Sequence, residues 1–179
     1  MTEKAKMLNG ELYDSSDKQL VDELIKYKVL IKDLISREVS YSQRNELVTI
    51  SMYIAANFEL YDSFINNIEI PFSKLQMFTR VNKKFLEKYR DYIIVYTLIF
   101  GNDKYKNIQD YLQMVETSVD DSKNSDVKDI VEYEAGLTVN GIVVWKNKKD
   151  AILLTALGEF KKVKLNEDVL IGQEINANE

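Results

Sequence analysis

The sequence contains neither cysteine nor histidine, and these two absences exclude most of the familiar catalytic and metal sites. Without cysteine there is no disulfide and no thiolate nucleophile. Without either residue the chain lacks the usual ligands of zinc and the general base of a nucleophilic triad. We therefore expect a protein that is not an enzyme, that has no cofactor and no metal, and that acts by contact with a partner.

Proline and glycine are also scarce, with one proline and six glycines in 179 residues. No glycine-rich loop of the kind that cradles phosphates is present, so nothing argues for nucleotide binding. The longest apolar run, Tyr92 to Phe100, is about half the length that a membrane-spanning helix requires. Residues 1–10 carry charges throughout and lack the apolar stretch of a secretory signal. These features predict a cytoplasmic protein that does not enter a membrane.

The overall composition is that of a folded globular protein, with 45% hydrophobic and 30% charged residues. Its 24 basic and 29 acidic side chains give a formal net charge of −5. A surplus of acid argues against nucleic-acid binding over the whole surface, although a local basic patch is compatible with it.

Apolar residues recur at three- and four-residue steps in the first two thirds of the chain, and this spacing predicts four to five helices within residues 1–117. The expected helices are Asp17–Glu38, a second from Ser40 or Ser42 to about Leu60–Ile65, a third from a cap at Ser73 to Gly101 with a break near Val81–Asn82, and Lys104–Thr117. Pro71 marks a connection. The segment from Tyr92 to Phe100 is apolar nearly all round and is expected at the centre of the core, with a strand as the alternative.

The pattern changes after the small, polar and acidic residues 118–126, which are expected to form a linker. Residues 127–172 then predict an antiparallel β module of three to four strands. Asn140–Gly141 is expected to form a hairpin turn, with further turns at Asn147–Asp150 and at Gly158. Residues 173–179 are polar and are expected to be a frayed tail. The predicted fold class is therefore α+β, a helical bundle followed by a small antiparallel sheet.

One family resemblance is carried by residues 3–35, where Lys6-Met7-Leu8, Gly10-Glu11-Leu12-Tyr13-Asp14 and Asp17 with Leu20-Val21 follow a recognisable pattern. This segment resembles the N-terminal helical domain of the maltose and galactoside O-acetyltransferases. The resemblance implies that Tyr13 and Asp14 lie near a small ligand. It leaves open whether the segment is homologous or convergent.

The rest of the chain lacks what acetyl transfer needs. The left-handed β-helix of that family requires an aliphatic residue at every sixth position and many small turn residues, which this sequence does not supply. Family members also resemble one another in using a histidine base, and this chain has none. We therefore expect no acetyltransferase activity.

The most distinctive polar set is an aromatic residue with six lysines in the β module. Such a set is suited to phosphate contact and base stacking. The alternative is that lysines on edge strands prevent association between sheets. The candidate partner-binding residues are Trp145, Lys146, Lys148, Lys149, Lys161, Lys162 and Lys164.

The leading functional hypothesis is a non-enzymatic binding protein, a small regulator or inhibitor that occupies a protein or nucleoprotein partner. One concrete form is a phage- or mobile-element-encoded anti-defence protein such as an anti-CRISPR. One alternative is nucleic-acid binding through the lysines of the β module. Another is an enzyme, such as a nuclease, that holds a divalent ion with carboxylates. Glu132 and Glu134 are a separate candidate pair, for acid–base chemistry.

Overall fold

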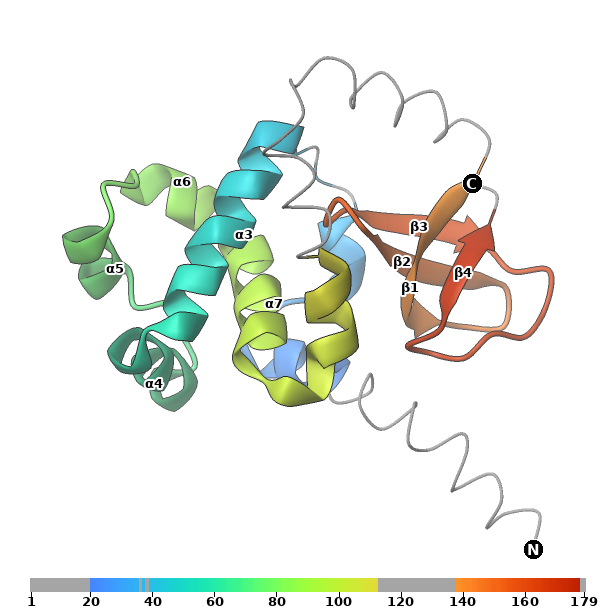
Figure 1. Ribbon diagram of the computed structural model, residues 1–179, viewed down its shortest axis with the longest axis horizontal. Coiled ribbons are helices and arrows are strands. Elements are labelled where there is room, and N and C mark those ends of the chain that lie inside the picture. The colour runs from blue at the N-terminus through green and yellow to red at the C-terminus, as the bar shows by residue number, and fades with distance from the viewer. Residues whose placement is uncertain (1–19, 36, 38, 113–137, 178–179) are drawn as a thin grey trace, which may run out of the picture. The chain divides into compact units, whose positions relative to one another are not determined.

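The computed structural model describes residues 20–35, 37, 39–112 and 138–177, and it has the predicted α+β organisation (Figure 1). Helices come first along the chain, and a four-stranded antiparallel sheet follows them. The chain divides into two compact units, of which one, the helical unit, spans Asp22–Lys106 and the other contains the sheet. The predicted linker at 118–126 lies outside the described residues, so the domain boundaries around it stay predictions.

The first described helix is shorter than the single helix predicted from Asp17 to Glu38. Residues 20–26 are helical, and the helix ends where Lys28 adopts a φ of 60°. The backbone N–H of Val29 then donates to the Leu24 carbonyl at 2.9 Å. This hydrogen bond is typical of an α-helix that ends at a residue in the left-handed conformation. The 3-10 helix η2 (Ile31–Leu34) follows. The prediction was wrong because glycine is the usual residue in a left-handed conformation at a helix end. A lysine at this position gives no such signal in the sequence.

Helix α3 (Tyr41–Ala56) begins at Ser40, one of the two caps that the sequence predicted. The Ser40 hydroxyl accepts from the Gln43 backbone at 3.2 Å, and the Gln43 side chain accepts from the Ser40 backbone at 2.9 Å. These reciprocal hydrogen bonds form a capping box. The helix ends earlier than predicted because the Asn57 side chain accepts from the Leu60 backbone at 3.1 Å and so starts a new helix.

The remaining elements of this part are α4 (Phe58–Asn67), α5 (Phe72–Phe78), α6 (Lys83–Lys88), α7 (Arg90–Gly101) and η3 (Asp103–Tyr105), and residues 106–112 are again helical. The predicted break near Val81–Asn82 is confirmed, since the Asn82 side chain caps α6. The predicted cap at Ser73 is wrong, because Pro71 precedes the first helical residue and Ser73 lies inside α5. Proline suits the start of a helix because a backbone N–H at that position has no partner within the helix.

Helix α7 is the centre of the helical core, as its apolar sequence predicted. Every residue from Tyr92 to Ile99 is buried. Helix α3 packs along it (Figure 1). At its end, a Cβ on Gly101 would collide with the Tyr61 ring, so glycine allows α7 to approach α4 closely.

Thr97 is fully buried in α7, and its hydroxyl has no hydrogen-bond partner among the described residues. A buried hydroxyl without a partner costs free energy, whereas valine has a similar shape and no polar group. We expect Thr97→Val to raise the free energy of unfolding by about 1 kcal/mol in urea denaturation. Ser51→Ala is the control, since the Ser51 hydroxyl donates to the Leu47 carbonyl at 2.7 Å and its loss should not stabilise. A Thr97→Val protein no more stable than wild type would contradict this reading.

Tyr27 connects the start of the helical unit to α4. Its ring stacks on Phe64 with the ring centroids 4.8 Å apart, and its hydroxyl donates to the Phe64 carbonyl at 3.3 Å. Burial, with a smaller contribution from nearby Tyr61 and Glu23, raises the pKa of Tyr27 to about 12. The neutral phenol is therefore the form that the folded state favours.

This pKa predicts loss of stability at alkaline pH. Between pH 10 and about pH 12 the unfolded chain releases the Tyr27 proton, whereas the folded chain keeps it. The unfolded state then binds fewer protons, so the free energy of unfolding falls as pH rises through this range. Urea denaturation at about pH 9 and about pH 11 should show the fall, and Tyr27→Phe should make it shallower. An equally steep fall in Tyr27→Phe would assign the effect to other groups.

The sheet consists of β1 (Val139–Lys146), β2 (Asp150–Thr155), β3 (Phe160–Lys164) and β4 (Glu174–Ala177). Their order is β3-β2-β1-β4, and all neighbouring pairs are antiparallel. The first three strands form the predicted meander. The fourth returns to the far side of β1, which gives a Greek-key order.

Asn140–Gly141 is not the hairpin turn that the sequence predicted. Both residues lie inside β1, where Gly141 is opposite Thr155 of β2 and Ile175 of β4. A Cβ on Gly141 would lie 2.8 Å from the Leu154 carbonyl oxygen. Glycine is therefore required here for the close approach of two strands and not for a turn.

The frayed tail predicted for residues 173–179 is also corrected, because Glu174–Ala177 form β4. In this strand Glu174 and Asn176 are exposed, whereas Ile175 and Ala177 pack against the sheet core. Such alternation over four residues is too short to distinguish a strand from a polar tail in the sequence. Residues 178–179 lie outside the described residues.

The other two predicted turns are confirmed. The Asn147 side chain accepts from the backbones of Lys149 and Asp150 at 2.8 and 2.7 Å, which forms the turn between β1 and β2. Gly158 has a φ of 79° in the connection to β3.

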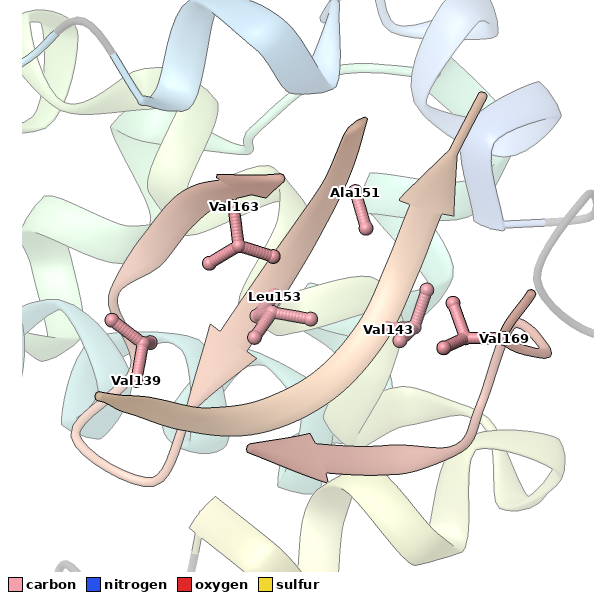
Figure 2. Close-up of a cluster of buried hydrophobic side chains, with 6 residues drawn as sticks. All are labelled: Val139, Val143, Ala151, Leu153, Val163 and Val169. Atoms are coloured by element: carbon pink, nitrogen blue, oxygen red, sulfur yellow. The ribbon is translucent and has the colours of Figure 1, made fainter. Parts of the chain in front are cut away.

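One face of the sheet has a hydrophobic core (Figure 2). It is formed by Val139, Val143, Ala151, Leu153, Val163 and Val169.

Candidate functional site

The predicted partner-binding set is distributed over three places in the sheet. Trp145 and Lys146 end β1, Lys148 and Lys149 lie in the following turn, and the other three lysines lie on β3. Lys161 is opposite Leu153, whereas Lys162 is opposite Ile152. Because consecutive residues of a strand point to opposite faces, these lysines do not gather on one surface.

Acidic side chains lie close to several of these lysines. The ion pairs join Lys146 to Asp168 at 3.2 Å, Lys161 to Glu159 at 3.4 Å, and Lys162 to Asp150 at 3.5 Å. Residues 138–177 contain six lysines and five acids. The sheet is therefore nearly neutral and does not present a continuous basic surface, so a role of these lysines in binding stays a prediction.

On β1 and β2 the second face of the sheet is apolar as well, whereas β3 places Lys162 on it, opposite Ile152. The pairing register places Ile142 opposite Leu154, Leu154 opposite Phe160, and Trp145 opposite Ile152, so these five residues share that face. A β-bulge between Val143 and Trp145 shifts the register in which β1 pairs with β2. We call this surface the Trp145 face (Ile142, Trp145, Ile152, Leu154 and Phe160). Antiparallel strands with one face in water would alternate apolar and polar residues, and the central residues of β1 and β2 do not.

A basic segment in the helical unit was missed by the sequence reasoning. From Lys74 to Arg90 there are six basic residues and one acid, although the whole chain has a charge of −5. Helices α5 and α6 contact each other and are joined by four residues, 79–82. Arg80, Lys84 and Lys88 are exposed on the turn and on α6. The charge run was readable in the sequence, but an average over the whole chain conceals it.

Several candidates lie outside the described residues. These are the ligand candidates Tyr13 and Asp14 and the carboxylate pair Glu132 and Glu134. Within residues 20–112 and 138–177, as far as they are described, no three acidic side chains gather as metal ligands would. A hollow of about 330 Å³ between α4 and α5 is lined mainly by uncharged residues, together with Glu69 and Lys74.

Two known families match this chain, each over part of its length. Residues 139–177, from the start of β1 to the end of β4, match the family described as the anti-sigma factor N-terminus. Residues 6–49 match the maltose acetyltransferase hexapeptide capping motif, which confirms the resemblance noted for residues 3–35. Each match covers less than half of the chain.

A curated relative is the RNA polymerase sigma factor SigI2 of Acetivibrio thermocellus, which is 35% identical over 78 residues. The match covers 44% of this chain and 29% of the relative, so the chain spans less than a third of that protein's length. The match is longer than the segment 107–179 that contains the sheet, so it also includes residues of the helical unit. No solved structure matches this chain.

These similarities support the coarse form of the functional prediction, a regulatory protein that binds a protein partner. They do not bear on a phage origin or on anti-CRISPR activity, which stay predictions. None of the described helices has the length and apolar character needed to cross a bilayer.

Proposed function

We propose that this chain is a non-enzymatic regulator of transcription that binds an RNA polymerase sigma factor through its four-stranded sheet. The observation that carries the proposal is the coincidence of the anti-sigma similarity, residues 139–177, with the complete sheet. A similarity that begins and ends with a folded module indicates a shared module and not a chance run of strands.

The sheet has features that suit a protein partner. Trp145 is only partly buried at the end of β1, and the turn that follows exposes Lys148 and Lys149. Aromatic side chains are common anchors of protein interfaces, and charged residues at the rim increase the rate of encounter. Among the described residues, neither lysine of this turn is held in an ion pair, so both are available to a partner.

The proposal is tested by calorimetric titration of the full chain with each purified sigma factor of the organism that encodes it, and with SigI2. We expect one of them to bind at one-to-one stoichiometry with a Kd on the order of 1 µM or below. Lys148→Glu with Lys149→Glu should weaken binding about tenfold, chiefly through the association rate. The charge-matched control is Lys26→Glu with Lys106→Glu, which should bind as wild type. Absence of binding to every sigma factor would refute the proposal.

A second candidate function, DNA binding by the helical unit, is favoured by the basic segment. Two helices joined by three or four residues form the helix-turn-helix arrangement, in which the second helix enters the major groove. Here α5 and α6 are joined by the four residues 79–82 and contact each other, and the exposed side chains of α6 include Lys83 and Lys84. A local positive charge of this kind supplies phosphate contacts.

Fluorescence anisotropy with a labelled mixed-sequence duplex of about 30 base pairs tests this second function. We expect binding that weakens steeply with salt, and that Lys83→Glu with Lys84→Glu reduces at least tenfold. Lys148→Glu with Lys149→Glu should leave it unchanged. If instead the sheet variant alone lost binding, the lysines of the β module would be the nucleic-acid site. Retention by both variants would exclude specific phosphate contact at either place.

A further inference from the structure

The outer face of α4 exposes a large apolar surface. Phe58, Ile65 and Ile68 are 86%, 41% and 46% exposed. Phe58 and Ile65 are seven residues apart and so lie on one side of the helix, beside the partly buried Tyr61, and Ile68 follows at the C-cap. We call these three residues the α4 stripe.

One member of the stripe is held in an unfavourable backbone conformation. Ile68 is the C-cap of α4 and has φ 53° and ψ 41°, in the left-handed region. Glycine or asparagine normally occupies such a position, since a β-branched residue is strained there. Isoleucine thus costs stability and adds exposed apolar surface, a combination typical of residues retained for contact with another molecule.

The charged side chains of α4 and of the residues next to it in the sequence are acidic, and one of them pairs with a lysine of α5. Between Arg44 and Lys74 the chain contains four acids and no base. Glu59 pairs with Lys74 at 3.3 Å. Asp62 and Glu69 are exposed and have no ion pair with the rest of the described chain. The stripe is therefore bordered by uncompensated negative charge.

We propose that the α4 stripe docks an amphipathic helix of a partner protein whose apolar face is bordered by lysine or arginine. Apolar residues spaced as on this helix match the face of a second amphipathic helix. Basic borders on the partner complement Asp62 and Glu69. A second copy of this chain is disfavoured, because a two-fold interface would bring these acids against their own counterparts. Negative charge likewise disfavours a nucleic acid.

The test uses the full chain and two synthetic amphipathic helices. One peptide carries leucine on one face and lysine on the other, and the second has every lysine replaced by glutamate. The basic peptide should bind at least tenfold more tightly than the acidic one. In amide NMR spectra, its shift changes should centre on α4. Equal binding of the two peptides, or shift changes elsewhere, would overturn the proposal.

Variants separate docking from folding. Phe58→Asp should weaken binding of the basic peptide at least tenfold, whereas Met77→Asp, at an 82% exposed site on α5 outside the stripe, should not. Asp62→Lys with Glu69→Lys should reverse the preference between the two peptides. Ile68→Gly should raise the thermal midpoint by relieving the left-handed strain while weakening the peptide several-fold. If the thermal midpoint of Ile68→Gly rose while its affinity for the basic peptide stayed unchanged, Ile68 would not be part of the peptide contact.

Sedimentation velocity tests the occupancy of the stripe by a second copy. The proposal expects a monomer at concentrations of up to about 100 µM. A dimer that Phe58→Asp dissociates would show that the stripe is an interface between copies, and would overturn the proposal.

Discussion

Gly141→Ala should disrupt the sheet and remove sigma-factor binding. A Cβ at this position would lie 2.8 Å from the Leu154 carbonyl oxygen and 3.0 Å from the Leu153 Cβ. The nearest contact is backbone, so relief requires β1 and β2 to separate. We expect at least a hundredfold loss of affinity in the titration, about 3 kcal/mol, together with loss of the amide NMR dispersion of residues 138–177.

The neighbouring residue supplies the control for this prediction. Asn140 lies in the same strand and is exposed, so Asn140→Ala should keep the sheet and the affinity within about twofold of wild type. A Gly141→Ala protein with a native sheet spectrum would contradict this prediction, because it would show that β1 and β2 can move apart enough for the added Cβ without disrupting the sheet. A native spectrum with lost binding would instead place Gly141 in the contact itself.

Phe64→Ala should cause the largest loss of stability in the helical unit. Phe64 is fully buried on α4, stacks on Tyr27, and also lies against the Tyr61 ring with the centroids 6.2 Å apart. Truncation leaves a cavity among rings that cannot easily collapse. We expect a loss of about 3–5 kcal/mol in the free energy of unfolding, measured by urea denaturation.

The same helix provides a phenylalanine of the opposite kind. Phe58→Ala should change the free energy of unfolding by less than about 0.5 kcal/mol, because its side chain is almost entirely exposed. The basic peptide should nevertheless lose affinity for this variant. Equal destabilisation by the two truncations would contradict the assignment of Phe64 to the core and of Phe58 to a docking surface.

The apolar spacing predicted the α+β fold and the buried position of α7, because burial imposes the helical period on the sequence. It did not predict where helices are interrupted. Lys28 takes a left-handed conformation without being glycine, and Asn57 caps a new helix in the middle of an apolar run. Such interruptions depend on tertiary packing of the flanking segments, which periodicity does not record.

The sheet shows the same limit at a single residue. Asn140–Gly141 has the composition of a turn, yet Gly141 is needed because two strands approach closely at its Cα. Local composition cannot distinguish these two uses of glycine. The lysines of the β module likewise form one set in the sequence, although the pairing register puts Lys161 and Lys162 on opposite faces and both have acids beside them. Pairing register, and hence the face of each residue, became readable only from the structure.

Hydrogen–deuterium exchange of the full chain, alone and with a saturating sigma factor, tests most directly whether the sheet is the binding module. We predict slower amide exchange within residues 138–177, strongest at the end of β1 and in the turn at Asn147–Asp150, and unchanged exchange in α3. Protection confined to residues 22–106, with the sheet unaffected, would contradict the assignment of sigma-factor binding to the sheet.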